Sequence, residues 1–182
     1  MQQTKQVIEE TKKWINKVVI GNNFCPFASK AMMYGKVHYQ VEYSSVTTVC
    51  TNALHNELMR LDEDESIETS FLIFPNTFKI FDDYLDLVNE AEYFLQSKGY
   101  EGIYQIASFH PLYLFAGSTN DDAANYTNRS IYPMLHLLRE SSIDKALLNY
   151  KNPEEIPSNN LKFAKEKGLL YFQMLKDSCR ME

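Results

Sequence analysis

His110 and Cys25 are the side chains of this sequence that suit acid–base and nucleophilic chemistry best. His110 directly follows the apolar run 103–109. An imidazole, with an unperturbed pKa of about 6.5, can act as a general base or as a metal ligand. A cysteine can act as a nucleophile when a histidine activates it and a carboxylate orients that histidine. We therefore take as candidate catalytic residues His110, Cys25, Asp121 and Asp122. The alternative for Cys25 is a buried, unreactive thiol.

A second group of side chains suits the binding of a small anion. Arg129 is the only cation in segment 111–130, and a guanidinium fits the oxygens of a carboxylate or phosphate. Tyr132, His136 and Arg139 recur at helical spacing. This spacing predicts a polar helix face next to an apolar one. The candidate substrate-binding residues are Arg129, Asn125, Asn128, Tyr132, His136 and Arg139. The alternative is a solvated helix face with ordinary side-chain pairs.

Segment 111–130 shows no regular periodicity. Structureless loops longer than about 12–15 residues inside compact domains are usually functional or disordered. This one contains the aromatic residues Tyr113, Phe115 and Tyr126 among Asn, Ser and Asp. Neutral hydrogen-bonding groups mixed with aromatic rings are typical of a ligand pocket. The loop therefore predicts a pocket after the third strand, with a purely structural surface loop as the alternative.

The sequence identifies no cofactor and no metal. Candidate metal ligands exist, but they form no compact ligand motif; they are Cys25, His110, Asp121, Asp122 and His136. No Walker A sequence and no GxGxxG sequence occurs, so no nucleotide cradle is indicated.

Hydrophobic periodicity predicts the elements that position these residues. Apolar residues at helical spacing predict helices over 5–19, 46–61 and 77–97. Alternating or short apolar runs predict strands over 36–43, 69–74 and 103–109. Further helices are expected over 131–140, 143–149 and 158–176. Alternating strands and helices indicate an α/β fold with a small sheet of about three or more strands and a helical carboxyl-terminal part. A two-layer α+β arrangement is the alternative.

Composition restricts the class of protein. The chain has 182 residues, of which 45% are hydrophobic, 23% charged and 13% aromatic, which suits one globular domain. A net charge of −6 disfavours a nucleic-acid binder. No apolar run reaches the roughly 18 residues of a membrane span, and no signal peptide is evident. The three cysteines lack a CxxC pair, which favours reduced thiols in a cytoplasm.

Several longer strings resemble one protein family. They are WINKVVIGNNFCPFA (14–28), segment 70–75, GIYQIASFHP (102–111), Asp121-Asp122, NYTNRS (125–130) and YPMLHLLRE (132–140). They resemble domain-of-unknown-function family 1415, a mainly bacterial family, over about residues 8–160. The resemblance implies no activity, cofactor or catalytic residue. We expect one α/β family domain over 1–160 and a helical extension over 161–182.

Two functions remain open on the sequence alone. One is an enzyme that acts on a small polar or anionic substrate at the loop after the third strand. The other is a non-catalytic module that binds a metabolite or a partner. The oligomeric state is not indicated.

Overall fold

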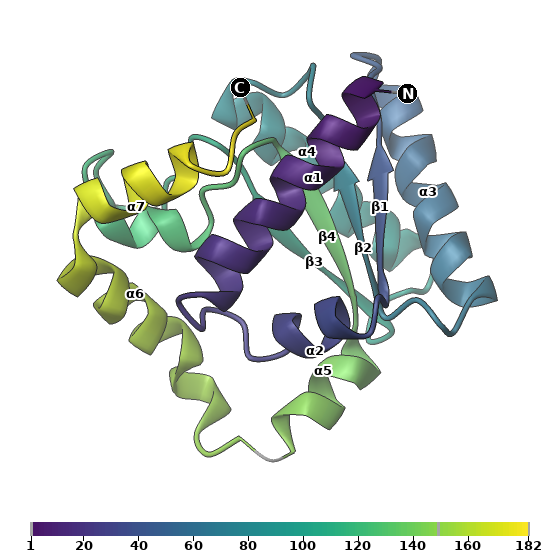
Figure 1. Ribbon diagram of the computed structural model, residues 1–182. Coiled ribbons are helices and arrows are strands. Elements are labelled where there is room, and N and C mark those ends of the chain that lie inside the picture. The colour runs from purple at the N-terminus through teal and green to yellow at the C-terminus, as the bar shows by residue number, and fades with distance from the viewer. Residues whose placement is uncertain (1, 149, 182) are drawn as a thin grey trace.

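A four-stranded mixed sheet forms the centre of the computed structural model, which describes residues 2–148 and 150–181. The strands are β1 (Val37–Val41), β2 (Thr69–Ile73), β3 (Tyr104–Phe109) and β4 (Met134–Arg139), in the spatial order β1-β2-β4-β3 (Figure 1). β1 and β2 are parallel, and β4 runs antiparallel to both of its neighbours. The three predicted strands are confirmed, and the fold is α/β.

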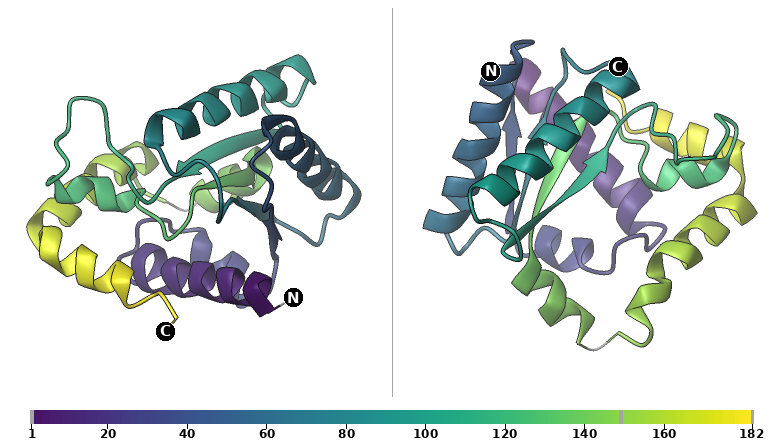
Figure 2. Two further views of the ribbon diagram at one scale, coloured as in Figure 1. Left: turned by 90° about the horizontal axis from the view of Figure 1, so that it is seen from above. Right: turned by 180° about the vertical axis from the view of Figure 1, so that it is seen from behind.

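Helices cover both faces of this sheet. α1 (Gln2–Trp14) continues as a π-helical segment, Ile15–Ile20, and crosses one face, whereas α3 (Thr47–Glu63) and α4 (Phe81–Ser97) cover the other (Figure 2). Two hydrophobic cores result. The core below α3 and α4 includes Leu54, Leu58, Leu72, Tyr84 and Leu135. The core below α1 includes Trp14, Phe71, Ile73, Met134 and Phe172. The molecule therefore has three layers rather than two.

β4 corrects the predicted helix over 131–140. Its residues pair with β2 on one side and with β3 on the other, for example His136 with Phe71 and with Ala107. A short apolar run that is buried on both faces has the same pattern in a central strand as in a buried helix. Without β4, β2 and β3 would have no common partner.

The remaining helices lie at the carboxyl-terminal half and before β1. They are α2 (Ala28–Met33), which the sequence pattern did not indicate, α5 (Glu140–Leu147), α6 (Ile156–Lys167) and α7 (Leu169–Asp177). Two 3-10 turns, Ala123–Thr127 and Pro153–Glu155, complete the set. α5 corresponds to the helix expected over 143–149, whose last residue, Asn149, lies outside the described residues.

Two predicted helices have different bounds for a backbone reason. The helix expected over 158–176 is two helices, because Gly168 between them has a φ of 85°, which ends α6. The helix expected from residue 77 begins at Phe81, because Phe78 has a φ of 54° and cannot be part of a right-handed helix.

The carboxyl-terminal helices contribute to the core below α1. Phe172 and Cys179 are fully buried there. Among the described residues, no helix combines the length and the apolar character that crossing a bilayer requires.

Candidate functional site

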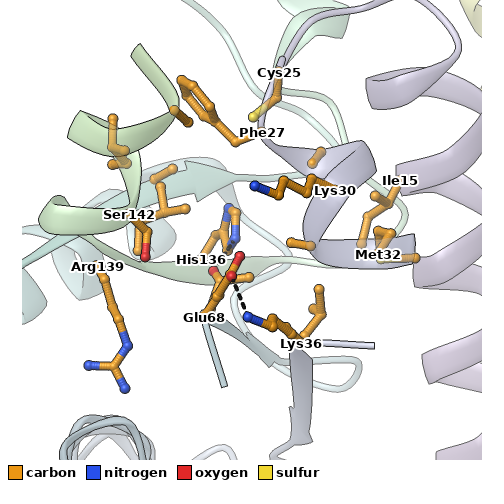
Figure 3. Close-up of a pocket in the computed structure, with 18 of the residues that line it drawn as sticks. Ile15, Cys25, Phe27, Lys30, Met32, Lys36, Glu68, His136, Arg139 and Ser142 are labelled. Atoms are coloured by element: carbon orange, nitrogen blue, oxygen red, sulfur yellow. Dashed lines mark hydrogen bonds and ion pairs between the residues drawn. The ribbon is translucent and has the colours of Figure 1, made fainter. Parts of the chain in front are cut away.

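A cavity of about 720 Å³ opens on the α1 face of the sheet. Its floor comes from the middle of the sheet, and its walls come from the end of α1, from α2 with the loop before it, and from α5 (Figure 3). Most of the lining is apolar, and it includes Trp14, Ile15, Phe27, Phe71, Phe109 and Ile143. The lining also contains polar and charged residues, among them Lys30, Lys36, Glu65, Glu68, His136 and Lys145.

His136 is the polar group at the floor of this cavity. Its ring stacks on Phe71 with 3.9 Å between the centroids and 7° between the planes. Nε2 lies 2.6 Å from Oγ1 of Thr69, and that hydroxyl donates its only proton to the carbonyl of Leu137. Nε2 must therefore carry a proton and donate it to Thr69. Nδ1 is then a free acceptor, with no hydrogen-bond partner among the described residues.

The electrostatic environment keeps His136 neutral. Burial lowers the pKa of His136 from an ordinary 6.5 to about 3. The protonated ring is disfavoured because the aromatic floor cannot solvate a charge. At neutral pH His136 is thus a fixed acceptor rather than a cation.

Charged side chains surround the space above this floor. Lys30 extends over His136 from α2 and forms no ion pair within residues 2–148 and 150–181 (Figure 3). Lys36 pairs with Glu68 at 2.9 Å, so that the charge of Lys36 is compensated. The sequence analysis missed both lysines, because neither stands in a motif and α2 was not predicted.

Cys25 also lines this cavity, from the loop before α2. Its side chain is half-buried, and burial raises the pKa of the Cys25 thiol although the backbone amides of Phe27 and Ala28 oppose this. The thiol is therefore protonated at neutral pH and a poor nucleophile.

His110 lies elsewhere, on the opposite face of the sheet, and it is fully buried. Nε2 donates to the carbonyl of Phe78 at 2.7 Å, and Nδ1 accepts the amide of Leu112 at 3.0 Å. Burial lowers the pKa of His110. Because both ring nitrogens are bonded to backbone, the imidazole has no free position for a substrate proton. The geometry gives His110 a structural role. Its hydrogen bond holds Phe78, whose positive φ is strained, in place.

The four candidate catalytic residues do not come together. Asp122 caps the 3-10 turn by accepting the amide of Ala124 at 2.9 Å, and it pairs with Lys165 at 3.2 Å. Asp121 is exposed on the same loop. No hydrogen bond or ion pair joins these aspartates to His110 or Cys25 in the part of the chain that the structure describes.

The segment 111–130 is held by its own polar side chains. Asn125, fully buried, accepts the amide of Phe115 and donates to the carbonyl of Thr119. Asn128 donates to the carbonyl of Ser108 at 3.1 Å. These amides satisfy backbone groups rather than face a ligand, and the segment does not line the cavity.

The predicted polar face of Tyr132, His136 and Arg139 does not exist, because these residues lie on or before a strand. The hydroxyl of Tyr132 donates to the buried Glu10 at 2.6 Å. Arg139 also borders the cavity, but its guanidinium extends to the other face of the sheet, where it donates to the carbonyls of Leu61 and Ile67.

Sequence comparison supplies the relationship of this chain to other proteins. The model of the family described as a protein of unknown function, DUF1415, matches residues 6–174. The chain belongs to DUF1415. The match includes all of α6 and most of α7, beyond the resemblance over 8–160. No curated protein and no solved structure matches the chain.

In this DUF1415 chain, a cluster of titratable groups that the sequence analysis missed surrounds Glu57. Glu57 on α3 is buried, and its carboxylate accepts from Nδ1 of His38 at 2.8 Å, from Ser70 and from Nε of Arg60 at 3.1 Å. Burial alone would raise the pKa of Glu57, but these hydrogen bonds outweigh it and lower the pKa. The cluster ties the edge strand β1 to α3. The apolar spacing of α3 did not mark Glu57 as buried.

Metal ligation finds no support in this DUF1415 fold. Within the described ranges, no three side chains of His, Cys, Asp or Glu gather closely enough to hold a metal ion. The candidate ligands Cys25 and His136 share a cavity with Glu65 and Glu68, but among the described residues these side chains do not gather into a three-ligand cluster.

Proposed function

We propose that this protein binds a small organic anion in the cavity on the α1 face of the sheet. The ligand would carry an apolar or aromatic body, an acidic group and a hydrogen-bond donor. The observation that carries this proposal is the free Nδ1 of His136 at the floor of an otherwise largely apolar cavity.

The chemistry of the lining supports each part of this ligand. The stacked rings of Phe71 and His136, with Phe109 beside them, offer flat surfaces to an aromatic group. Nδ1 of His136 can accept a hydroxyl or amide proton. Lys30, which forms no ion pair among the residues that the structure describes, suits a carboxylate or phosphate at the cavity mouth.

Binding without catalysis fits this cavity better than an enzyme. The specific feature that favours an enzyme is that Cys25 and His136 line one cavity. However, burial raises the pKa of the Cys25 thiol and lowers that of His136, so that both are neutral at pH 7. A nucleophilic thiolate needs a nearby cation or a basic partner. The pair supplies a hydrogen-bonding wall rather than an activated nucleophile.

Ligand chemistry can be tested by titration of the full chain with hydroxy-substituted aromatic carboxylates, followed by NMR shifts. Matched analogues without the hydroxyl and without the carboxylate serve as controls. We expect the hydroxy acids to bind more tightly than both analogues, by about tenfold for each missing group. Equal affinity of all three classes would contradict the proposal.

Substitution of cavity residues provides the second test. Ala146→Trp on α5 should fill the cavity and abolish binding, whereas Asp144→Trp on the exposed side of the same helix should not. His136→Phe keeps a ring on Phe71 but removes Nδ1, and it should weaken hydroxy acids more than hydroxyl-free acids. Binding that survives Ala146→Trp would place the ligand elsewhere.

A further inference from the structure

Two cations lie on one aromatic ring at a distance from the cavity described above. The guanidinium carbon of Arg129 is 5.0 Å from the ring centroid of Tyr126, and Nζ of Lys176 on α7 is 5.9 Å from it. Arg129 is only 8% exposed, and Lys176 is half-buried. Neither residue lines the cavity. The ring thus holds two positive charges at the junction of α7 with segment 111–130.

Both cations bind backbone carbonyls of the same loop. Nε of Arg129 donates to the carbonyl of Tyr113 at 2.9 Å, and Nζ of Lys176 donates to the carbonyl of Pro111 at 2.9 Å. Within residues 2–148 and 150–181, neither forms an ion pair with a carboxylate. The two terminal nitrogens of the guanidinium also lack a hydrogen-bond partner there. These two nitrogens are not among the fully buried atoms, so they reach solvent although the rest of the Arg129 side chain is buried.

The surrounding charges do not compensate this pair. Arg180 adds a third cation nearby, and its charge also helps to lower the pKa of the buried carboxyl of Glu10. Asp177 is exposed, and the neighbouring His110 is kept neutral by its lowered pKa. Burial, with the charges of Arg129 and Arg180, lowers the pKa of Lys176 to about 8. Like charges in a partly dry environment repel strongly, and an anion between them would remove this cost.

We propose that Arg129 and Lys176 form an oxyanion site for a phosphoryl-type group. The two free nitrogens of the guanidinium form a fork that matches two oxygens of such a group, and the ammonium can reach a third. An oxyanion held there bridges α7 and segment 111–130. The site is separate from the cavity and does not depend on its ligand.

The first experiment measures thermal stability of the full chain in sulfate, in inorganic phosphate and in chloride at equal ionic strength. Sulfate and phosphate should raise Tm in a saturable way, whereas chloride should not. Lys176→Gln should weaken the sulfate affinity by about tenfold or more. Lys176→Arg should retain it, and Lys162→Gln, which replaces an exposed lysine on α6, should behave like the wild type. Equal effects of sulfate and chloride would overturn the proposal.

The pH dependence distinguishes this site from unspecific anion binding. Sulfate does not titrate near neutrality, so any change between pH 7 and pH 9 comes from the protein. Wild-type affinity should fall over this range as Lys176 loses its proton, and Lys176→Arg should show no such fall. Identical pH profiles for the two proteins would overturn the assignment of Lys176.

A measurement on the wild-type chain covers the case in which Lys176→Gln does not fold. An amine with a lowered pKa reacts faster with acetic anhydride at pH 8 than an exposed lysine does. Peptide mass spectrometry should show that sulfate protects Lys176, with Lys162 as the internal reference. Acetylation of Lys176 at the same rate with and without sulfate would count against the site.

Discussion

Oγ1 of Thr69 lies 2.6 Å from Nε2 of His136 and donates its own proton to the carbonyl of Leu137. These three groups belong to the neighbouring strands β2 and β4, so the rigid sheet fixes the tautomer of the imidazole. This fixation aims an acceptor nitrogen into the cavity. A side chain held by a strand presents its hydrogen-bonding group at lower entropic cost than one on a flexible loop.

Thr69→Val should allow the imidazole of His136 to adopt either neutral tautomer. Valine keeps the shape of threonine but leaves Nε2 of His136 and the carbonyl of Leu137 without their partner. We expect a loss of about 1–3 kcal/mol in the free energy of unfolding. The ring nitrogens of His136, observed by ¹⁵N NMR, should change from one tautomer to a mixture. Thr69→Ser retains the hydroxyl and should keep the wild-type ¹⁵N shifts; unchanged shifts in Thr69→Val would contradict the arrangement.

Acid should destabilise the protein through His136. The folded-state pKa is about 3 and the unfolded-state pKa about 6.5, so between these pH values only the unfolded chain binds the proton. The free energy of unfolding therefore falls as pH falls from about 6.5 toward 3, by up to about 1.4 kcal/mol per pH unit for one proton. His136→Phe should lose this part of the slope in urea denaturation.

His110 acts in the same direction, because burial also lowers its pKa. The loss of stability in acid that His110 causes remains in His136→Phe. For the wild type and for His136→Phe, the free energy of unfolding is therefore compared with its own value at pH 7.5. If the free energy of unfolding falls with pH equally steeply in His136→Phe and in the wild type between pH 6 and pH 4, His136 takes up a proton readily in the folded state.

The sequence could predict those parts of the fold whose hydrophobic pattern is local. The strands β1, β2 and β3 follow from alternating or short apolar runs, and the helices α1 and α3 from helical spacing. β4 was wrongly predicted as part of a helix, because the apolar residues of a short strand that packs on both faces can also fall at helical spacing. Cys25 and His136 were named, but their common cavity depends on how α2 and α5 pack on the sheet. Sequence spacing does not contain that information, nor does it show that both nitrogens of His110 bind backbone.

Glu57 should contribute stability above pH 4.5. Hydrogen bonds from His38, Ser70 and Arg60 lower the pKa of this buried carboxyl below its ordinary 4.5. Its contribution is complete above pH 4.5 and is lost as pH falls through the lowered folded-state pKa. Glu57→Gln should cost about 1–3 kcal/mol at pH 7, measured by urea unfolding. The gap to the wild type should narrow below pH 4.5; a gap that stays constant with pH would show that the charge is not what stabilises this cluster.

Cys25 should be the thiol that reacts in the folded chain, and it should react slowly. Cys50 and Cys179 are fully buried, whereas Cys25 reaches the cavity. Because burial raises the pKa of Cys25, alkylation by iodoacetamide at pH 7.5 should be roughly tenfold slower than for a peptide thiol. The rate should rise with pH, and a ligand of the cavity should reduce it. Mass spectrometry of the labelled peptides measures this, and fast labelling of Cys25 at pH 7.5 would indicate an activated thiol.

His110→Leu should reduce stability without reducing ligand binding in the cavity. The substitution removes the donor for the carbonyl of Phe78 and the acceptor for the amide of Leu112, both in a fully buried site. We expect a loss of about 2–4 kcal/mol in urea unfolding, with the affinity for hydroxy acids unchanged where the chain is folded. His110→Asn, which restores one hydrogen-bonding group, should lose less. The opposite outcome, lost binding at unchanged stability, would return His110 to the functional site.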